Sequence, residues 1–91
     1  MNDNSKKIVG LLEETGQAHH QAFLDVDGFD PEWPLWYADY LMDKLPPLLE
    51  ADLTKSELVY LLVYLHNSHQ LEAPGSRWAR YYAKVLIDKY L

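Results

Sequence analysis

The sequence predicts an all-α fold, a single-domain bundle of about four helices joined by short loops. Three observations indicate this class. Apolar residues recur at three- and four-residue spacing in four segments, Gly and Pro residues separate those segments, and no segment alternates polar and apolar residues as a strand would. The 91 residues suffice for one domain, which we place at 1–91 with a frayed end over about residues 1–6.

The first predicted helix runs from about Asn4 or Ser5 to Leu24. Its apolar face is made of residues at helical spacing: Ile8, Leu11, Leu12, Thr15, Ala18, Ala22 and Phe23. Gly10 and Gly16 weaken this helix by roughly 1 kcal/mol each relative to alanine, which favours fraying of its first turns.

The segment 25–34 is not expected to form regular helix or strand, because Gly28, Pro31 and Pro34 disrupt both. Pro34 suits the first position of a second helix, where a missing N–H has no cost. Pro46-Pro47 should end or kink that helix. Its apolar stripe is Leu35, Ala38, Leu41, Met42 and Leu45.

The third predicted helix covers 55 to about 70 and begins with a capping box, in which Thr54 and Glu57 each accept from the other's backbone N–H. It is apolar around most of its circumference, which is typical of a helix at the centre of a bundle or at an interface. The last helix covers 77–91, and we expect Ser76 to cap it.

Charge and composition exclude several classes. The net charge is −6 and no basic stripe is present, which argues against a nucleic-acid partner. The longest apolar run, residues 58–65, is far shorter than the ~20 residues that span a bilayer, so no membrane partner is expected. The absence of cysteine excludes disulfides and thiolate sites. Without an export signal in the sequence, we expect a cytoplasmic protein.

The segment 19–40 is the candidate binding region. It holds both phenylalanines, two of the three tryptophans and two of the four histidines, and loops held by a rigid scaffold often carry function. The alternative is a purely structural role, in which the aspartates of this segment form turns and Asp30 caps a helix that starts at Pro31. The candidate binding residues are His19, Asp27, Asp30, Trp33, Trp36 and, as a partner from another helix or chain, Arg77.

A divalent metal site is an alternative, although no cofactor is predicted outright. Two histidines lie near the end of the first helix and two near the end of the third, and loop carboxylates could join them. The candidate ligands are His19, His20, Asp25, Asp27, His66 and His69. A calcium loop of the EF-hand type does not fit, because it needs glycine at its sixth position and glutamate at its twelfth. Histidines near helix C-termini can instead stabilise the helix dipole.

Arg77 and Arg80 lie near the start of the last helix, where the helix dipole disfavours cations. We expect the acidic loop to be their partner, through arginine–carboxylate contacts. The alternative is an anion clamp formed by both guanidinium groups and the helix N-terminus at Ser76.

The string from Asp27 to Leu41, DGFDPEWPLWYADYL, with His19-His20 before it, resembles a motif of small bacterial proteins, DGxDPEWPxWYAxYL. That group brings no established activity. The resemblance covers about the first half of the chain, and it implies a bacterial cytosolic origin without indicating a chemistry.

Twelve aromatic residues in 91 exceed what one small core easily buries, and Tyr and Trp are favoured at interfaces. The sequence therefore favours a protein-interaction or ligand-binding module that acts as a homodimer, with a protein or a small ligand as its partner. One alternative is a small metal-binding protein or acid–base enzyme with its site at 19–40. Another is a pocket for a small anionic or aromatic ligand between the second and last helices. The sequence leaves open whether the protein is an enzyme.

Overall fold

The structure is a computed structural model that describes residues 3–91. Within these residues it contains five α-helices, one 3-10 turn and no strand, so the predicted all-α class is confirmed. The start of the predicted frayed end, residues 1–2, lies outside the described part. The elements are α1 (Asp3–Ala22), η1 (Leu24–Val26), α2 (Trp33–Leu41), α3 (Leu45–Leu49), α4 (Lys55–Glu72) and α5 (Trp78–Tyr90).

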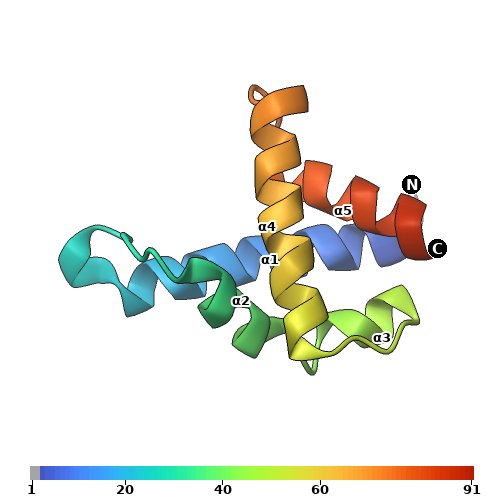
Figure 1. Cartoon of the computed structure of the whole chain (residues 1–91), viewed down its shortest axis with the longest axis horizontal. Coiled ribbons are helices and arrows are strands. Elements are labelled where there is room, and N and C mark those ends of the chain that lie inside the picture. Colours follow the sequence, from blue (N-terminus) through green and yellow to red (C-terminus); the bar gives the residue numbers. More distant parts are fainter. Residues whose placement is uncertain (1–2) are drawn as a thin grey trace.

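Two helix pairs make the most extensive contacts, α1 with α5 and α2 with α4. Figure 1 shows α5 alongside one half of α1, while α4 crosses in front of α1 at a steep angle, next to the start of α5. The core lies between these two helix pairs. Its fully buried large apolar side chains come from all five helices: Ile8, Leu12, Leu41, Leu45, Leu49, Leu58, Leu62, Leu65 and Leu86.

The segment after α2 differs from the prediction. Pro46 and Pro47 do not simply end or kink the second helix, because they lie in the first turn of a separate short helix, α3. The first turn has no intrahelical acceptor for its N–H groups, so proline is tolerated there. Leu45 and Leu49 from this helix are buried in the core.

The start of α4 is as predicted, and the start of α5 is not. Thr54 Oγ1 accepts from the Glu57 N–H at 3.1 Å, and the Glu57 carboxylate accepts from the Thr54 N–H at 2.9 Å, which completes the capping box. Ser76 does not cap α5. Its hydroxyl donates instead to the Ala73 carbonyl at 2.8 Å, and the N-cap residue is Arg77, whose side chain makes no capping hydrogen bond.

The segment between α1 and α2 begins and ends about two residues earlier than predicted, and covers 23–32 instead of 25–34. Helix α1 ends at Ala22, a 3-10 turn follows over 24–26, and α2 already begins at Trp33. The chain reverses at Asp27 and Gly28, which have φ values of 59° and 82°. The φ value favours glycine at the second position, and a Cβ there would also lie 2.8 Å from His20 Nδ1, so the exposed His20 ring would have to move.

The two glycines of α1 should respond differently to alanine. Gly10 has open space around it, whereas a Cβ on Gly16 would lie 3.1 Å from the Trp78 ring. We expect Gly10→Ala to raise the free energy of unfolding by about 0.5–1 kcal/mol through helix propensity. Gly16→Ala should gain clearly less, because the Trp78 ring must move slightly to admit the methyl group. Urea denaturation of both variants measures the difference, and equal gains would contradict close packing at Gly16.

None of the helices in the described residues has the length and apolar character needed to cross a membrane.

Candidate functional site

A histidine–aspartate pair joins the end of α1 to the loop. His19 Nε2 donates to Asp30 Oδ2 at 3.0 Å, and each side chain is only 10% exposed. The second oxygen of Asp30 accepts from the Glu32 N–H at 3.0 Å. Asp30 thus shapes the turn before α2 rather than capping a helix that starts at Pro31, since α2 begins two residues later.

Three aromatic rings enclose the His19 imidazole. The ring centroids of Phe23, Trp36 and Tyr37 lie 4.9, 5.1 and 5.3 Å from it. His19 as a whole is 8% exposed. Of the predicted binding residues, the structure therefore brings together His19, Asp30 and Trp36, in an arrangement that fixes the loop against α1.

The other predicted binding residues lie apart from this pair. Trp33 packs edge-on against Tyr37 at 5.2 Å and contacts the His66 ring at 5.4 Å. Asp27 is exposed at the reversal of the loop. The predicted partner of Arg77 was wrong, because its guanidinium pairs with Glu13 of α1 at 2.6 Å and not with the acidic loop.

The candidate metal ligands do not assemble. His19 is taken up by Asp30, His66 lies against Trp33, and His69 Nε2 donates to the Ser76 carbonyl at 2.9 Å. His20 is exposed. Over residues 3–91, no group of three or more His, Asp or Glu side chains is placed so that it could hold a metal ion.

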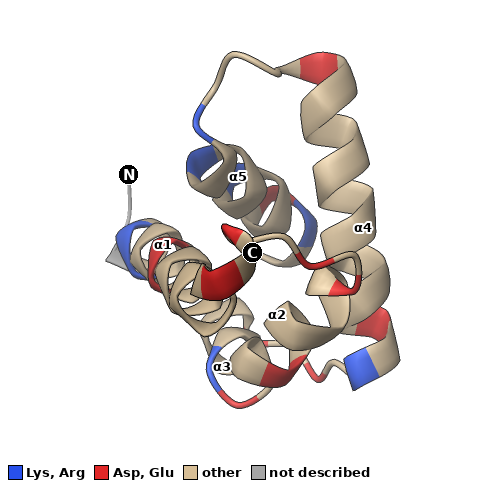
Figure 2. Ribbon diagram, turned by 90° about the vertical axis from the view of Figure 1, so that its left-hand side faces the viewer, with Lys and Arg blue, Asp and Glu red and all other residues tan. Residues whose placement is uncertain are grey.

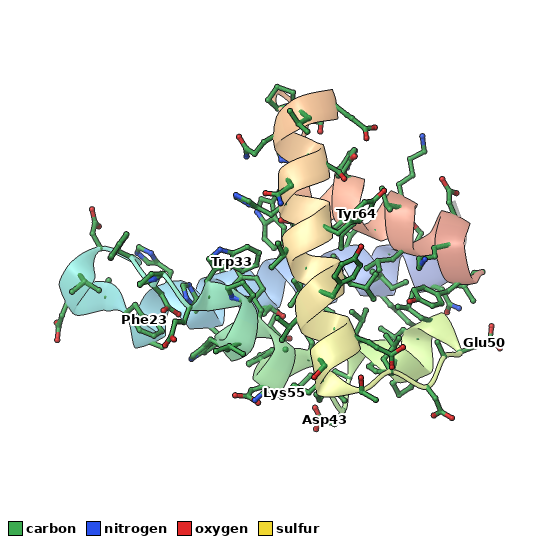
Figure 3. The ribbon with its side chains drawn as sticks, viewed as in Figure 1. Phe23, Trp33, Asp43, Glu50, Lys55 and Tyr64 are labelled. Atoms are coloured by element: carbon green, nitrogen blue, oxygen red, sulfur yellow. The ribbon has the colours of Figure 1, made fainter. Side chains whose placement is uncertain are left out.

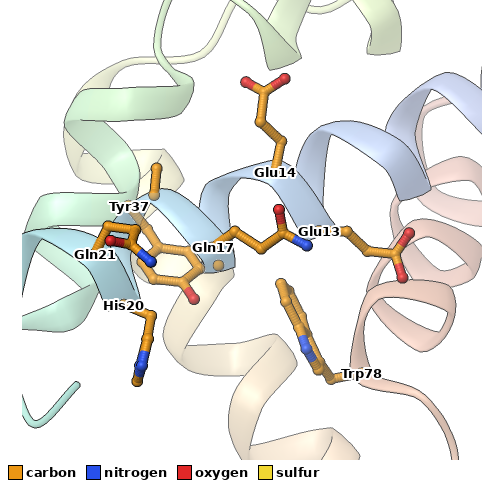
Figure 4. Close-up of a pocket in the computed structure, with 9 residues that line it drawn as sticks. Glu13, Glu14, Gln17, His20, Gln21, Tyr37 and Trp78 are labelled. Atoms are coloured by element: carbon orange, nitrogen blue, oxygen red, sulfur yellow. The ribbon is translucent and has the colours of Figure 1, made fainter. Parts of the chain in front are cut away.

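Two depressions meet at Tyr37 and Trp78. The first is an open groove of about 730 Å³ on α1, where Gln17, His20 and Gln21 lie around these two rings (Figure 4). The second, which we call the aromatic pocket, measures about 380 Å³ and lies between α2, α4 and α5. Its lining residues are Trp33, Tyr37, His66, His69, Gln70, Trp78 and Tyr82.

Burial perturbs the tyrosines of this region. Desolvation raises the pKa of Tyr37 above its ordinary value. It also raises the pKa of Tyr82 to about 12, with a smaller contribution from the nearby Tyr37 hydroxyl. Both hydroxyls are therefore neutral donors near neutral pH. The predicted binding residues did not include three that line this region: Tyr37, Tyr82 and Gln70. The sequence pointed to them only through their helical spacing from Trp33, Trp78 and His66.

The outer face of α4 is the second distinctive surface. From Leu58 to Leu71 this helix carries no Asp, Glu, Lys or Arg, and Figure 2 shows its charged residues confined to the two ends. Tyr60 is 70% exposed, Tyr64 49% and Leu71 85%. Figure 3 shows Tyr64 projecting from the side of α4 that faces α5. A shallow groove of about 460 Å³ lies there, between α4 and α5.

No protein-family model, curated protein or solved structure matches the chain.

Proposed function

We propose that the protein is a homodimeric helical interaction module of the bacterial cytoplasm, whose two subunits meet through the outer face of α4. The observation that carries this proposal is an exposed stripe on α4 without charge, in a chain in which 24% of residues are charged. A helix that faces only water normally presents charged residues on its outer side.

The stripe has the spacing of a helix–helix seam. Tyr60, Tyr64, Asn67 and Leu71 follow one another at intervals of four, three and four residues. This alternation is the pattern by which one helix packs against a second along its length. Tyrosine suits such a contact, because its ring is buried while its hydroxyl finds a partner.

A second copy of the chain is the occupant that we propose for this stripe. The net charge of −6 makes two copies repel each other, and α4 is where they can meet without opposing carboxylates. In a two-fold, antiparallel arrangement, Tyr64 of one subunit faces Asn67 of its partner, and Tyr60 faces Leu71. Opposed helix dipoles add to this preference.

The groove beside the stripe has an apolar lining and charged residues of both signs, as a contact between two copies of the chain would need. Leu61, Leu65, Val85 and Leu86 line it, and it is bordered by two residues of opposite charge, Asp88 and Lys89. Under two-fold symmetry the lysine of each subunit can approach the aspartate of the other. A partner's tyrosine ring would cover apolar area that each isolated subunit leaves exposed.

The test is a matched pair of Leu→Glu substitutions. Leu71 lies on the stripe and is 85% exposed. Leu24 lies in the 3-10 turn after α1, outside the stripe, and is 56% exposed. We expect the wild type to be a dimer. Leu71→Glu should raise the dimer dissociation constant about 100-fold, because it places a carboxylate in the interface. Leu24→Glu should leave the constant unchanged, because its carboxylate lies outside the interface. Sedimentation equilibrium gives all three constants.

Two results would contradict the proposal. One is a wild-type protein that stays monomeric at about 100 μM, a concentration at which even weak dimers are populated. The other is equal dissociation by Leu71→Glu and Leu24→Glu, which would place the contact away from α4. Far-ultraviolet circular dichroism confirms that both variants remain helical.

A further inference from the structure

The aromatic pocket has walls formed by successive rings in edge-to-face contact. Trp33 meets Tyr37 at 5.2 Å and 80°, Tyr37 meets Trp78 at 6.4 Å and 63°, and Trp78 meets Tyr82 at 5.1 Å and 75°. Of these four residues only Tyr82 is buried, while the other three keep part of their surface exposed. Perpendicular rings form a corner, in which a flat molecule stacks on one ring and meets the next with its edge.

No residue that lines the pocket is an aspartate, glutamate, lysine or arginine. An ionised ligand would lose hydration there without gaining a counter-charge, and this penalty is several kcal/mol for poorly compensated ions. Neutral ligands lose much less. While both lining histidines are neutral, the lining therefore selects against carboxylates, phosphates and ammonium groups on the part of a ligand that lies against the rings.

Polar groups are present at the side of the pocket formed by α4. His66 and Gln70 lie one helical turn apart, line the pocket and are exposed. The Gln70 amide both donates and accepts, and a neutral imidazole does the same through its two nitrogens. His69 is committed elsewhere, since its Nε2 donates to the Ser76 carbonyl and thereby holds the turn after α4 against the pocket.

We propose that the aromatic pocket binds a neutral, planar heteroaromatic molecule of one or two fused rings. The ring stacks in the corner of Trp33, Tyr37 and Trp78, and its polar edge bonds to Gln70 and His66. The size follows from the volume of about 380 Å³, near the lower end of the roughly 300–1,000 Å³ of small-molecule sites. This site is independent of the α4 stripe, so it stands or fails separately from the dimer.

Three tryptophans make the test internally controlled. Trp33 and Trp78 line the pocket, whereas Trp36 does not, so the three indole N–H signals of a ¹⁵N-labelled sample report separately on it. We expect benzimidazole to shift the Trp33 and Trp78 signals saturably, with a dissociation constant in the millimolar range or tighter for a nine-atom probe. The Trp36 signal should stay in place.

Two comparison probes define the ligand class. Cyclohexylmethanol is apolar and neutral but not planar, and indole-3-carboxylate is planar but ionised. Both should bind at least about tenfold more weakly than benzimidazole, because the first cannot stack and the second has no counter-charge. Tighter binding of either one would overturn the proposed class.

Two single variants locate the site. Gln70→Ala removes a lining amide of the pocket, and Gln21→Ala removes an amide that lines the neighbouring α1 groove instead. We expect Gln70→Ala to raise the benzimidazole dissociation constant about 3–10-fold, the loss of one hydrogen bond, and Gln21→Ala to leave it unchanged. The reverse pattern would place the ligand in the α1 groove and overturn the proposal, as would three unmoved tryptophan signals.

Discussion

Replacing His19 by alanine is expected to lower the free energy of unfolding by about 3–4 kcal/mol. The substitution empties a space enclosed by Phe23, Trp36 and Tyr37, and loss of a buried ring typically costs about 3–5 kcal/mol. It also leaves Oδ2 of the Asp30 carboxylate, a side chain only 10% exposed, without its donor. Urea denaturation followed by tryptophan fluorescence measures the change.

His20→Ala is the matched control, because the neighbouring imidazole is exposed. We expect its effect to stay within about 0.5 kcal/mol, as for most surface substitutions. If both variants lost the same stability, the pair of His19 with Asp30 would not be what holds the loop against α1.

Raising the pH from 10 to 12 is expected to destabilise the fold by about 2 kcal/mol through Tyr82 alone. Burial raises the pKa of this phenol from 10.0 to about 12 in the folded chain, and the side chain is 4% exposed. Below pH 10 the phenol is protonated in both states, so its contribution is fully present. Between the two values only the unfolded chain releases the proton, and stability falls by about 1.4 kcal/mol per pH unit.

Tyr82→Phe isolates this contribution from other groups that titrate at high pH. The variant keeps the ring but has no proton to release, so its free energy of unfolding should fall less steeply from pH 10 to 12. Guanidinium titrations of both proteins at pH 9, 10, 11 and 12 give the two slopes. Identical slopes would show that the Tyr82 phenol ionises at its ordinary pH in the folded chain.

The elements that could be predicted from the sequence are those with local causes. The capping box of Thr54 and Glu57 lies within four residues, and the apolar spacing of α1, α4 and α5 repeats every turn. Helix α3 could not be predicted in this way. It is five residues long, and burial of Leu45 and Leu49 against distant helices stabilises it.

In the candidate site, too, the residue types could be predicted from the sequence, whereas the contacts between distant residues could not. Residue type was sufficient to single out His19, Asp30 and Trp36, which the structure brings together. Their pairing depends on the direction in which the left-handed reversal at 27–28 sends the chain, whereas the Asp27-Gly28 sequence indicates only that a turn forms there. The partner of Arg77 depends on the rotation of α5 against α1, and packing of Trp78 on Gly16 helps to fix that rotation.

The pairing of the first helix with the last has a consequence for the order of folding. The most extensive contacts of α1 are with α5, so during synthesis α1 emerges long before its main partner exists. Its buried side chains Ile8 and Leu12 then have only transient cover. Contacts between distant segments are slow to form, because the chain loses the entropy of closing a long loop before these contacts stabilise it. The contact between α1 and α5 is therefore completed late, and removing α5 would deprive α1 of its most extensive contact.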